Sequence, residues 1–181
     1  MQYLVRNPYN PTIIKNIFSD DFIEECIQKS DHYTTIGDPN EPIGWKKVLD
    51  NKSFNNHKIS SDELEIKIIN REVVDPILPK IKKMVNNVNI KPSGYFIYPP
   101  SGFMGWHTNC SSPYIRLYIT YASEDKKSFF RYRHPETKEI ITDYDDKGIT
   151  IRQFEVIDKP PYFWHCVGSD CIRISLGYRI L

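Results

Sequence analysis

From Gly94 onward the chain is a succession of short segments rich in β-forming residues, separated by turn signals and by no helical pattern. The predicted strands cover residues 95–98, 114–121, 128–133, 149–156, 162–167 and 171–180. Strands at this regular spacing, without intervening helices, are typical of an antiparallel sandwich or barrel. The second half of the chain is therefore predicted to fold as one antiparallel β structure.

The first 90 residues carry two helical patterns and a long polar region. Ser19 is a favourable N-cap for a helix that begins at Asp20, and apolar residues follow at helical spacing at positions 22, 23, 26 and 27. A second pattern runs over residues 74–85, with prolines at 76 and 79 limiting its start. Residues 12–18 and 45–49 are predicted as short strands. We expect one mostly β domain with N-terminal helices, in which residues 1–90 support a core formed by residues 91–181.

Charge and cysteine content exclude several classes of protein. The 24 Lys and Arg residues nearly balance the 23 Asp and Glu residues, for a net charge of +1, so no nucleic-acid partner is indicated. The four cysteines have neither the spacing of a C-x-x-C metal site nor the density of a disulfide scaffold, and no apolar run has the length of a signal peptide or a membrane span. We expect a cytoplasmic protein without membrane association; the sequence carries no signal for an oligomeric state.

Two of the five histidines lie in apolar and aromatic surroundings. His107 ends the run Phe-Met-Gly-Trp-His, and His165 ends the run Tyr-Phe-Trp-His. His32, His57 and His134 lie in polar, turn-like segments that are typical of the surface. A single histidine in an apolar segment is usually a core residue. Two of them, on different strands of one β domain and each preceded by Trp, favour a shared site.

His107 and Asn109 are two positions apart, so their side chains point to the same face of a strand or of its end. A facial iron site takes such a pair from one strand and a third ligand from a distant strand, and His165, 58 positions after His107, fits that third role. Eight residues further on, Arg173 and Ser175 share one face of the last predicted strand. A guanidinium and a hydroxyl so placed would clamp a carboxylate.

The order His107-x-Asn109, distal His165 and Arg173-x-Ser175 resembles the Fe(II)- and 2-oxoglutarate-dependent dioxygenases, and most of all their prolyl-4-hydroxylase-like branch. The resemblance extends over most of the chain. Residues 14–22 resemble the lead-in strand and first helix of that branch, residues 116–121 the strand after the first metal motif, and residues 159–161 the turn before the distal histidine. It implies a double-stranded β-helix, a distorted jelly roll with a cupin-like core.

The resemblance also implies roles for individual residues. The two histidines and Asn109 would hold iron(II), the metal to which 2-oxoglutarate binds in this superfamily. Arg173 would bind the far carboxylate of 2-oxoglutarate, with Tyr98, Ser175 and Tyr118 as further residues that contact this co-substrate. The implied activity is hydroxylation of a C–H bond in a small-molecule or peptidyl substrate, with release of succinate and carbon dioxide.

Asn109 departs from the family, whose third metal ligand is Asp or Glu. An amide offers a neutral oxygen in place of a full negative charge, so weaker iron binding and a higher iron potential are expected. Three interpretations remain open: the amide oxygen binds iron in an active enzyme; water takes the position and two histidines hold the metal; or the site is degenerate and binds a ligand without oxidising it. A halogenase, in which a very small residue replaces the carboxylate, is disfavoured because Asn fills that space.

Two further residues are candidates for binding the substrate. Arg116 lies on the strand face of positions 116, 118 and 120, opposite positions 117, 119 and 121, which we assign to the hydrophobic core. If this face lines the metal cavity, Arg116 could bind a substrate carboxylate or support the metal ligands from behind. Trp106 could line a substrate pocket, although core packing is the stronger expectation.

Two other classes of protein fit parts of the pattern. A non-catalytic jelly-roll module, such as a virion or sugar-binding component with a decayed metal site, is favoured by Asn109 and opposed by the pairing of Arg173 with Ser175. A cupin-type metalloenzyme that needs no 2-oxoglutarate would have no use for Arg173.

Overall fold

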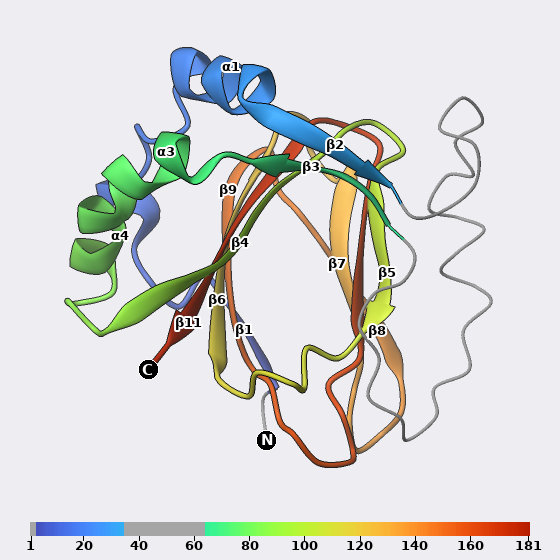
Figure 1. The fold of residues 1–181 in the computed structure, drawn as a ribbon. Helices are drawn as coiled ribbons and strands as arrows, with labels where there is room; N and C mark the ends of the chain where they lie inside the picture. The colour runs from blue at the N-terminus through green and yellow to red at the C-terminus, as the bar shows by residue number, and fades with distance from the viewer. Residues whose placement is uncertain (1–2, 35–63) are drawn as a thin grey trace.

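The computed structural model describes residues 3–34 and 64–181, and its main feature is one strongly curled antiparallel sheet (Figure 1). The sheet has 11 strands in the order β1-β9-β6-β11-β4-β3-β5-β10-β7-β8, with β2 paired to β3. The strands are β1 Leu4–Arg6, β2 Ser30–Thr34, β3 Leu64–Ile69, β4 Ile90–Tyr98, β5 Phe103–His107, β6 Ile115–Ala122, β7 Ser128–Arg133, β8 Ile140–Tyr144, β9 Gly148–Glu155, β10 His165–Ser169 and β11 Arg173–Ile180. The strand predicted at residues 45–49 lies outside the described residues.

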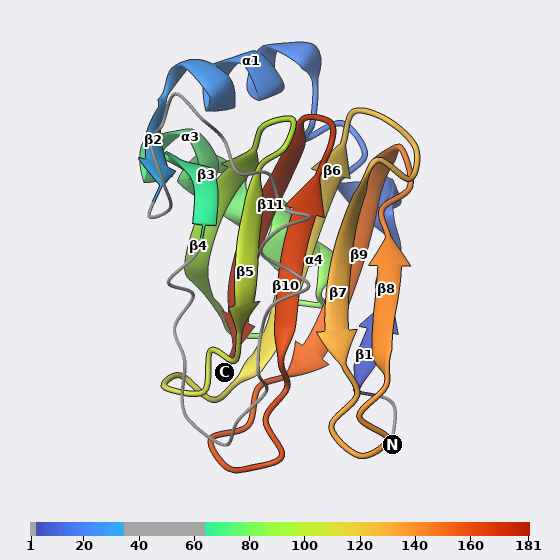
Figure 2. The same cartoon turned by 90° about the vertical axis from the view of Figure 1, so that its right-hand side faces the viewer.

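The curled sheet has two halves that face each other (Figures 1 and 2). Strands β1, β9, β6, β11 and β4 form one half, and β5, β10, β7 and β8 form the other. Strand β3 joins the halves, because its end pairs with β4 and its beginning pairs with β5. This is the double-stranded β-helix expected from the sequence, mostly β with a few helices.

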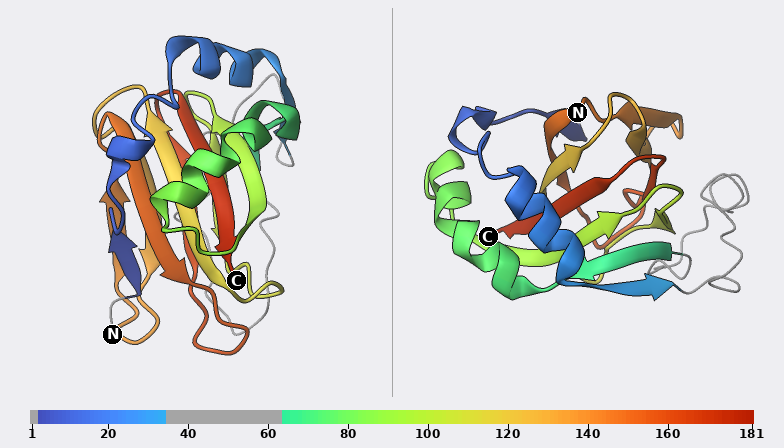
Figure 3. Two further views of the ribbon diagram at one scale, coloured as in Figure 1. Left: turned by 90° about the vertical axis from the view of Figure 1, so that its left-hand side faces the viewer. Right: turned by 90° about the horizontal axis from the view of Figure 1, so that it is seen from above.

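The helices cover the outer face and one end of the half that contains β6, β11 and β4 (Figure 3). They are η1 Pro11–Ile13, α1 Asp20–Gln28, α3 Arg71–Val74, η2 Asp75–Ile77 and α4 Leu78–Met84. The predicted cap is present, since the hydroxyl oxygen of Ser19 accepts a hydrogen bond from the backbone N–H of Phe22. The prolines at 76 and 79 divide the second predicted helix into three short pieces. None of the helices in the described residues is long and apolar enough to cross a bilayer.

Alternation along the strands separates the core under the helices from the interior of the barrel. On β11, Ile174, Leu176 and Tyr178 are fully buried and pack in the core beneath the helices. The intervening positions 173, 175, 177 and 179 therefore face the interior. The same holds for β6, where Leu117 and Ile119 join the helix-side core as predicted. Strands β6 and β11 consequently present mainly polar residues to the interior, beside an apolar cluster that includes Phe154 of this half and Phe130 of the other.

The strand predicted at residues 12–18 is wrong. The side chain of Asn10 accepts a hydrogen bond from the backbone N–H of Thr12, and Pro11 begins a 3-10 helix that is followed by turns. Proline at the first helical position favours this start. Three apolar side chains of the segment, Ile14, Ile17 and Phe18, are buried in the helix-side core, and their spacing is helical rather than alternating.

Sequence reasoning also missed five strands. Strands β1, β2 and β3 come from the first 90 residues, so this part of the chain contributes to the sheet as well as to the helices. Strand β8 carries only partly buried or exposed residues, which leaves little hydrophobic pattern to detect. Strand β5 contains glycine and lies inside an aromatic run, so its alternation is hidden.

Burial of the helix-side core should dominate stability. We expect Ile174→Ala to lower the free energy of unfolding by about 2–5 kcal/mol, because Ile174 is 0% exposed and the substitution leaves a cavity. The matched variant Ile140→Ala, at a strand position that is 42% exposed, should cost less than about 1 kcal/mol. Denaturant titration of both variants would measure the difference, and equal losses would contradict this packing.

Candidate metal centre and cavity

The imidazoles of His107 and His165 meet inside the barrel. His107 ends β5 and His165 begins β10, and the two residues are direct partners across the antiparallel pair. Their ring centroids are 4.1 Å apart, with an angle of 57° between the planes. Both residues are buried, at 4% and 0% exposure. Two segments 58 positions apart in the sequence therefore bring both predicted ligands to one point.

Both imidazoles are held in the same way by the backbone. The Nδ1 of His107 lies 2.8 Å from the carbonyl oxygen of Gly105, and the Nδ1 of His165 lies 3.1 Å from that of Phe163. A carbonyl oxygen only accepts, so each Nδ1 carries the proton and, in the neutral ring, each Nε2 carries the lone pair. This fixed tautomer is the one in which Nε2 serves as a metal ligand.

His165 lies in an aromatic environment that keeps it neutral. Its ring stacks on Phe130 at a centroid distance of 5.2 Å, and the rings of Phe154 and Phe163 lie 5.3 and 5.6 Å away. Burial, reinforced by the neighbouring His107, holds the pKa of His165 well below its ordinary value. At neutral pH its Nε2 is therefore a free base, as metal binding requires.

Asn109 follows β5 in a left-handed backbone conformation, with φ of 56°, which Asn adopts more readily than most residues. Its side-chain nitrogen lies 3.1 Å from the Nε2 of His165 and 3.5 Å from the hydroxyl of Tyr118. The amide thus contacts the lone pair that a metal ion would use. A metal at this position would displace that hydrogen bond, and only the amide oxygen could replace it as a ligand.

The donor set at this point consists of two imidazoles and one amide. Within the described ranges, no group of three or more His, Cys, Asp or Glu side chains could hold a metal ion. Imidazoles with lone pairs on a common side suit Fe(II) and other first-row divalent ions. The residues therefore fit such an ion, with all of its protein ligands neutral, so negative charge must come from a bound anion.

The two histidines and Asn109 line a cavity of about 130 Å³ between the two halves of the sheet. This volume corresponds to roughly ten water-sized spheres, which is enough for a five-carbon dicarboxylate. The wall also includes Tyr98 on β4, Tyr118 and Arg116 on β6, and Ser175 and Gly177 on β11. Glycine is required at position 177, since a Cβ there would lie 2.9 Å from the Ser93 hydroxyl, 3.0 Å from the Gly94 carbonyl oxygen and 3.2 Å from the ring of Tyr118.

Two tyrosines give the cavity neutral hydroxyl groups. Burial raises the pKa of Tyr98 and of Tyr118, and at Tyr118 the nearby Arg116, Arg173 and Asn109 only partly oppose this effect. Both phenols therefore remain protonated at neutral pH. Together with Ser175, they can donate hydrogen bonds to an anion in the cavity.

Arg173 lies behind this lining rather than in it. It is 1% exposed; its Nε donates to the carboxylate of Asp145 at 2.9 Å, and its Nη2 donates to the hydroxyl of Thr120 at 3.3 Å. Its guanidinium carbon lies 5.0 Å from the ring centroid of Tyr98. Its Nη1 is buried without a hydrogen-bond partner among the described residues. One donor of this guanidinium is therefore still available to a ligand.

Asp145 is a buried carboxylate between two arginines. Besides Arg173, it pairs with the Nη1 of Arg152 and accepts a hydrogen bond of 2.6 Å from Ser128. Burial opposes ionisation, but the charges of Arg173 and Arg152 and the Ser128 hydrogen bond hold the pKa of Asp145 well below its usual range. The carboxylate is therefore ionised at neutral pH.

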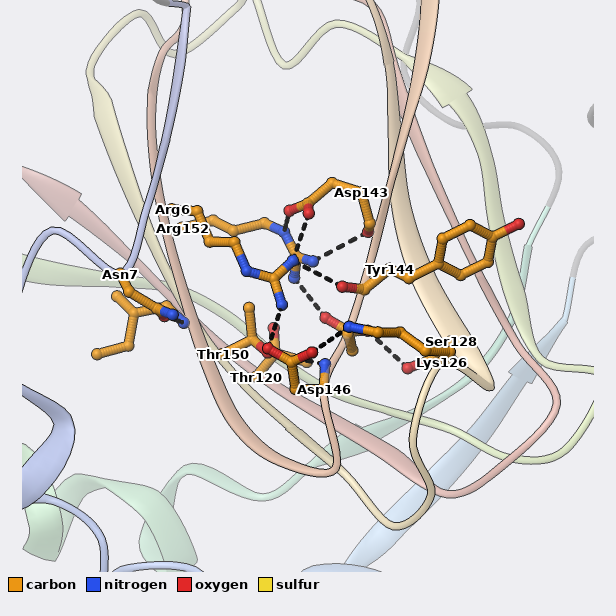
Figure 4. Close-up of polar contacts among 12 residues, drawn as sticks. Arg6, Asn7, Thr120, Lys126, Ser128, Asp143, Tyr144, Asp146, Thr150 and Arg152 are labelled. Atoms are coloured by element: carbon orange, nitrogen blue, oxygen red, sulfur yellow. Dashed lines mark hydrogen bonds and ion pairs between the residues drawn. The ribbon is translucent and has the colours of Figure 1, made fainter.

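The pairing continues outward to the edge strands of the sheet (Figure 4). Arg152 also pairs with Asp143 at 2.6 Å, and Arg6 on β1 pairs with Asp143 and, at 2.6 Å, with Asp146. Lys126 forms a further pair with Asp146. The network thus contains four cationic and three anionic side chains, so its net charge is +1 although each cation contacts a carboxylate. A bound carboxylate near Arg173 would complete the balance.

Arg116 and Trp106 occupy different environments. Arg116 is 5% exposed and lines the cavity. Trp106 is 1% exposed and packs with Trp164 in a separate buried cluster on the outer side of the strands that carry the histidines. Cys110 and Cys166 belong to that cluster too, away from the cavity lining.

Sequence reasoning did not single out Asp145 or Arg152. A signal existed at each position. Arg152 shares a strand face with Thr150 and Phe154, opposite Ile151 of the helix-side core, so alternation sends it into the interior. Asp143 and Asp145 are two positions apart and share a face at the end of a strand. Their pairing partners are far away in the sequence, and only the folded sheet identifies them.

Comparison with solved structures agrees with this architecture. A prolyl-4-hydroxylase from Pseudomonas putida aligns with a TM-score of 0.54 at 10% identity, over 99% of this chain and 93% of that one. A 2OG-Fe(II) oxygenase family oxidoreductase from Burkholderia pseudomallei aligns with a TM-score of 0.56 at 10% identity, over 98% and 85%. The sequence matches no protein-family model and no curated protein. The class that these comparisons define is the jelly-roll fold of 2-oxoglutarate oxygenases, and at this identity they show the fold alone.

The buried carboxylate should be essential for stability. We expect Asp145→Asn to lower the free energy of unfolding at neutral pH by about 3–5 kcal/mol, because it leaves buried guanidinium groups without their anion. Because folding lowers the pKa of Asp145, its stabilisation is complete above the ordinary carboxyl pKa of about 4 and is lost as the pH falls through the lowered value. The difference between parent and variant should therefore shrink in acid.

Denaturant titration at a series of pH values would measure this difference. Asp158→Asn, at an exposed position, is the matched control and should change stability by less than about 0.5 kcal/mol. A small, pH-independent loss in Asp145→Asn would contradict the described pairing.

Proposed function

We propose that this protein is an Fe(II)- and 2-oxoglutarate-dependent oxygenase that hydroxylates a C–H bond of a small-molecule or peptidyl substrate. The observation that supports it most is the pair of buried imidazoles, each fixed by a backbone carbonyl so that Nε2 is the free base, in a cavity of about 130 Å³. His107 and His165 would hold the metal, with the amide oxygen of Asn109 as the third ligand. The jelly-roll fold and the chain order of these residues are consistent with this class.

The surroundings of Arg173 support binding of the co-substrate. Its Nη1 is a buried donor without a partner among the described residues, and Arg173 shares the carboxylate of Asp145 with Arg152. Ser175 on β11 lies opposite Thr120 on β6. Along these strands, the two residues lie between Arg173 and the pair of Gly177 with Tyr118, the residue that contacts Asn109. A dicarboxylate that extends along this row would find hydroxyl donors and then the guanidinium.

Iron(II) with 2-oxoglutarate supplies oxidation of the substrate by dioxygen, in which one oxygen atom enters the new hydroxyl group and the other enters succinate as carbon dioxide is released. The chain's own residues bind and orient the reactants. Tyr98, Tyr118 and Ser175 donate hydrogen bonds in the cavity, and Phe130, Phe154 and Phe163 keep water from the buried face of His165. Because the protein ligands are neutral, the negative charge at the metal comes from the co-substrate.

The proposal is tested by spectroscopy and product analysis. Anaerobic addition of iron(II) and 2-oxoglutarate to the purified protein should give the visible charge-transfer band of the chelate, and air should then produce succinate. Loss of a residue that only orients a metal ligand typically lowers metal affinity by about 10–100-fold. His165→Ala removes a proposed ligand itself, so it should weaken iron(II) binding by more than this and should abolish the band. His32→Ala, on the exposed strand β2, is the matched control and should retain it.

Absence of the band and of succinate in the parent protein would instead favour a jelly-roll binding module. The hydrogen bond between the Asn109 amide and the Nε2 of His165 favours that alternative, because it occupies the lone pair that would bind a metal ion.

Variants at position 109 test how the third ligand acts. Asn109→Asp should tighten iron(II) binding by about tenfold or more, because a carboxylate adds a negative charge to a neutral ligand set. Asn109→Ala should weaken it by about tenfold, because an oxygen ligand is lost. Titration of iron(II) under anaerobic conditions would measure both. If Asn109→Ala binds iron as the parent does, water rather than the amide completes the site.

A further inference from the structure

Two arginines face each other at one end of the barrel interior. Arg116 on β6 and Arg179 on β11 are direct cross-strand partners. Like charges in this position repel each other and destabilise a sheet. Arg116 is 5% exposed and lines the cavity, and the Nε atoms of both arginines are buried. Their juxtaposition therefore concentrates positive charge where water is scarce.

The protein partners of this arginine pair are neutral. The Nη2 of Arg116 donates to the backbone oxygen of Ser112 at 2.8 Å, and the Nη1 of Arg179 donates to the hydroxyl of Ser112 at 3.1 Å. Arg179 also lies 5.7 Å from the ring centroid of Tyr114. Neither arginine forms an ion pair with a carboxylate of the described residues, and both Nε atoms lack a hydrogen-bond partner there. Burial and the charge of Arg179 lower the pKa of Arg116.

A buried guanidinium group such as that of Arg116, next to a second cation and without an anion, is costly, because charge in a low-dielectric interior needs a partner. Arg173, the other interior arginine on β11, differs from this pair, since it contacts a carboxylate, that of Asp145. We infer that Arg116 and Arg179, positioned by Ser112, form a binding site for a carboxylate group of the substrate. The free Nε–H groups supply the donors, and the anion removes the repulsion between the two side chains.

The location of the pair separates it from the proposed co-substrate site. Tyr118, which contacts Asn109, lies opposite Gly177. Arg116 and Arg179 are two residues to one side of that level, roughly 7 Å along the strands, whereas Arg173 is four residues to the other side, roughly 13 Å. An anionic substrate held at the first position and 2-oxoglutarate held toward the second would both reach the metal ligands. Assignment of the anion to the substrate rests on the proposed oxygenase function; the anion site itself does not.

The anion site can be tested in the metal-free protein with acetate as the probe. In ¹⁵N-labelled protein, the Nε–H signals of Arg116 and Arg179, assigned from Arg116→Met and Arg179→Met, should shift and saturate as acetate replaces chloride at constant ionic strength. In Arg116→Met the acetate affinity read at Arg179 should fall by about tenfold or more, as expected when charge-assisted hydrogen bonds are lost. Should Arg116→Met fail to fold, Arg179→Met read at Arg116 gives the same comparison.

Arg131 provides a matched control. Its Nε is also buried without a partner among the described residues, but it lies opposite Cys166 and faces the outer cluster rather than the cavity. Its signal should not respond to acetate, and Arg131→Met should bind acetate as the parent does. Equal responses at all three arginines, or no response at Arg116 and Arg179, would overturn the site.

Addition of zinc(II) and 2-oxoglutarate identifies which anion the pair serves. The substrate assignment predicts that acetate still binds at Arg116 and Arg179 when the zinc complex of 2-oxoglutarate has formed. Displacement of acetate by 2-oxoglutarate would mean that these arginines hold the co-substrate, and it would overturn the substrate assignment. Acetate binding in a protein that binds neither zinc nor 2-oxoglutarate would refute the oxygenase function while leaving the anion site in place.

Discussion

The carboxylate of Asp145, buried between Arg152 and Arg173, is the interaction on which the interior depends. Asp145 follows β8 in one half of the curled sheet, and the two arginines lie on β9 and β11 in the other half. One side chain therefore joins the two halves across the barrel and neutralises charges that could not otherwise be buried. This contact joins the two halves beside the cavity that contains the histidines, together with the apolar cluster of Phe130, Phe154 and Phe163.

The same alternation that builds the hydrophobic core creates a polar interior. Apolar residues on the outer face of β6 and β11 pack beneath the helices, so the intervening positions must face inward whatever their polarity. On β11 these positions are Arg173, Ser175, Gly177 and Arg179. These side chains contribute little hydrophobic stabilisation, because they bury little apolar surface. Polar residues at buried positions of an otherwise regular fold are typical of a functional surface.

Local sequence pattern was sufficient for the fold class and for the histidines, and insufficient for the charge network. The strands from residue 114 onward, except β8, were predicted, and β6 and β11 among them show clear alternation. His107 and His165 were recognisable from their aromatic flanks. The pairing of Asp145 with Arg152 and Arg173, and the opposition of Arg116 and Arg179, depend on which strands become neighbours. Register of this kind is a property of the whole sheet. The strand prediction at residues 12–18 is wrong because the buried apolar residues Ile14, Ile17 and Phe18 follow one another at helical spacing, after a 3-10 helix at residues 11–13.

Charge balance links the metal centre to both ends of the cavity. The candidate metal ligands carry no negative charge, and cationic groups lie on either side of them, at Arg173 and at the Arg116–Arg179 pair. A site of this kind holds a divalent cation weakly by itself, because nothing in the first set of ligands offsets the charge of the ion. Anions bound at the two cationic ends would supply that compensation. In the proposed oxygenase, metal, co-substrate and substrate should therefore bind cooperatively, and a neutral amide ligand from Asn109 would make each of them depend more strongly on the others.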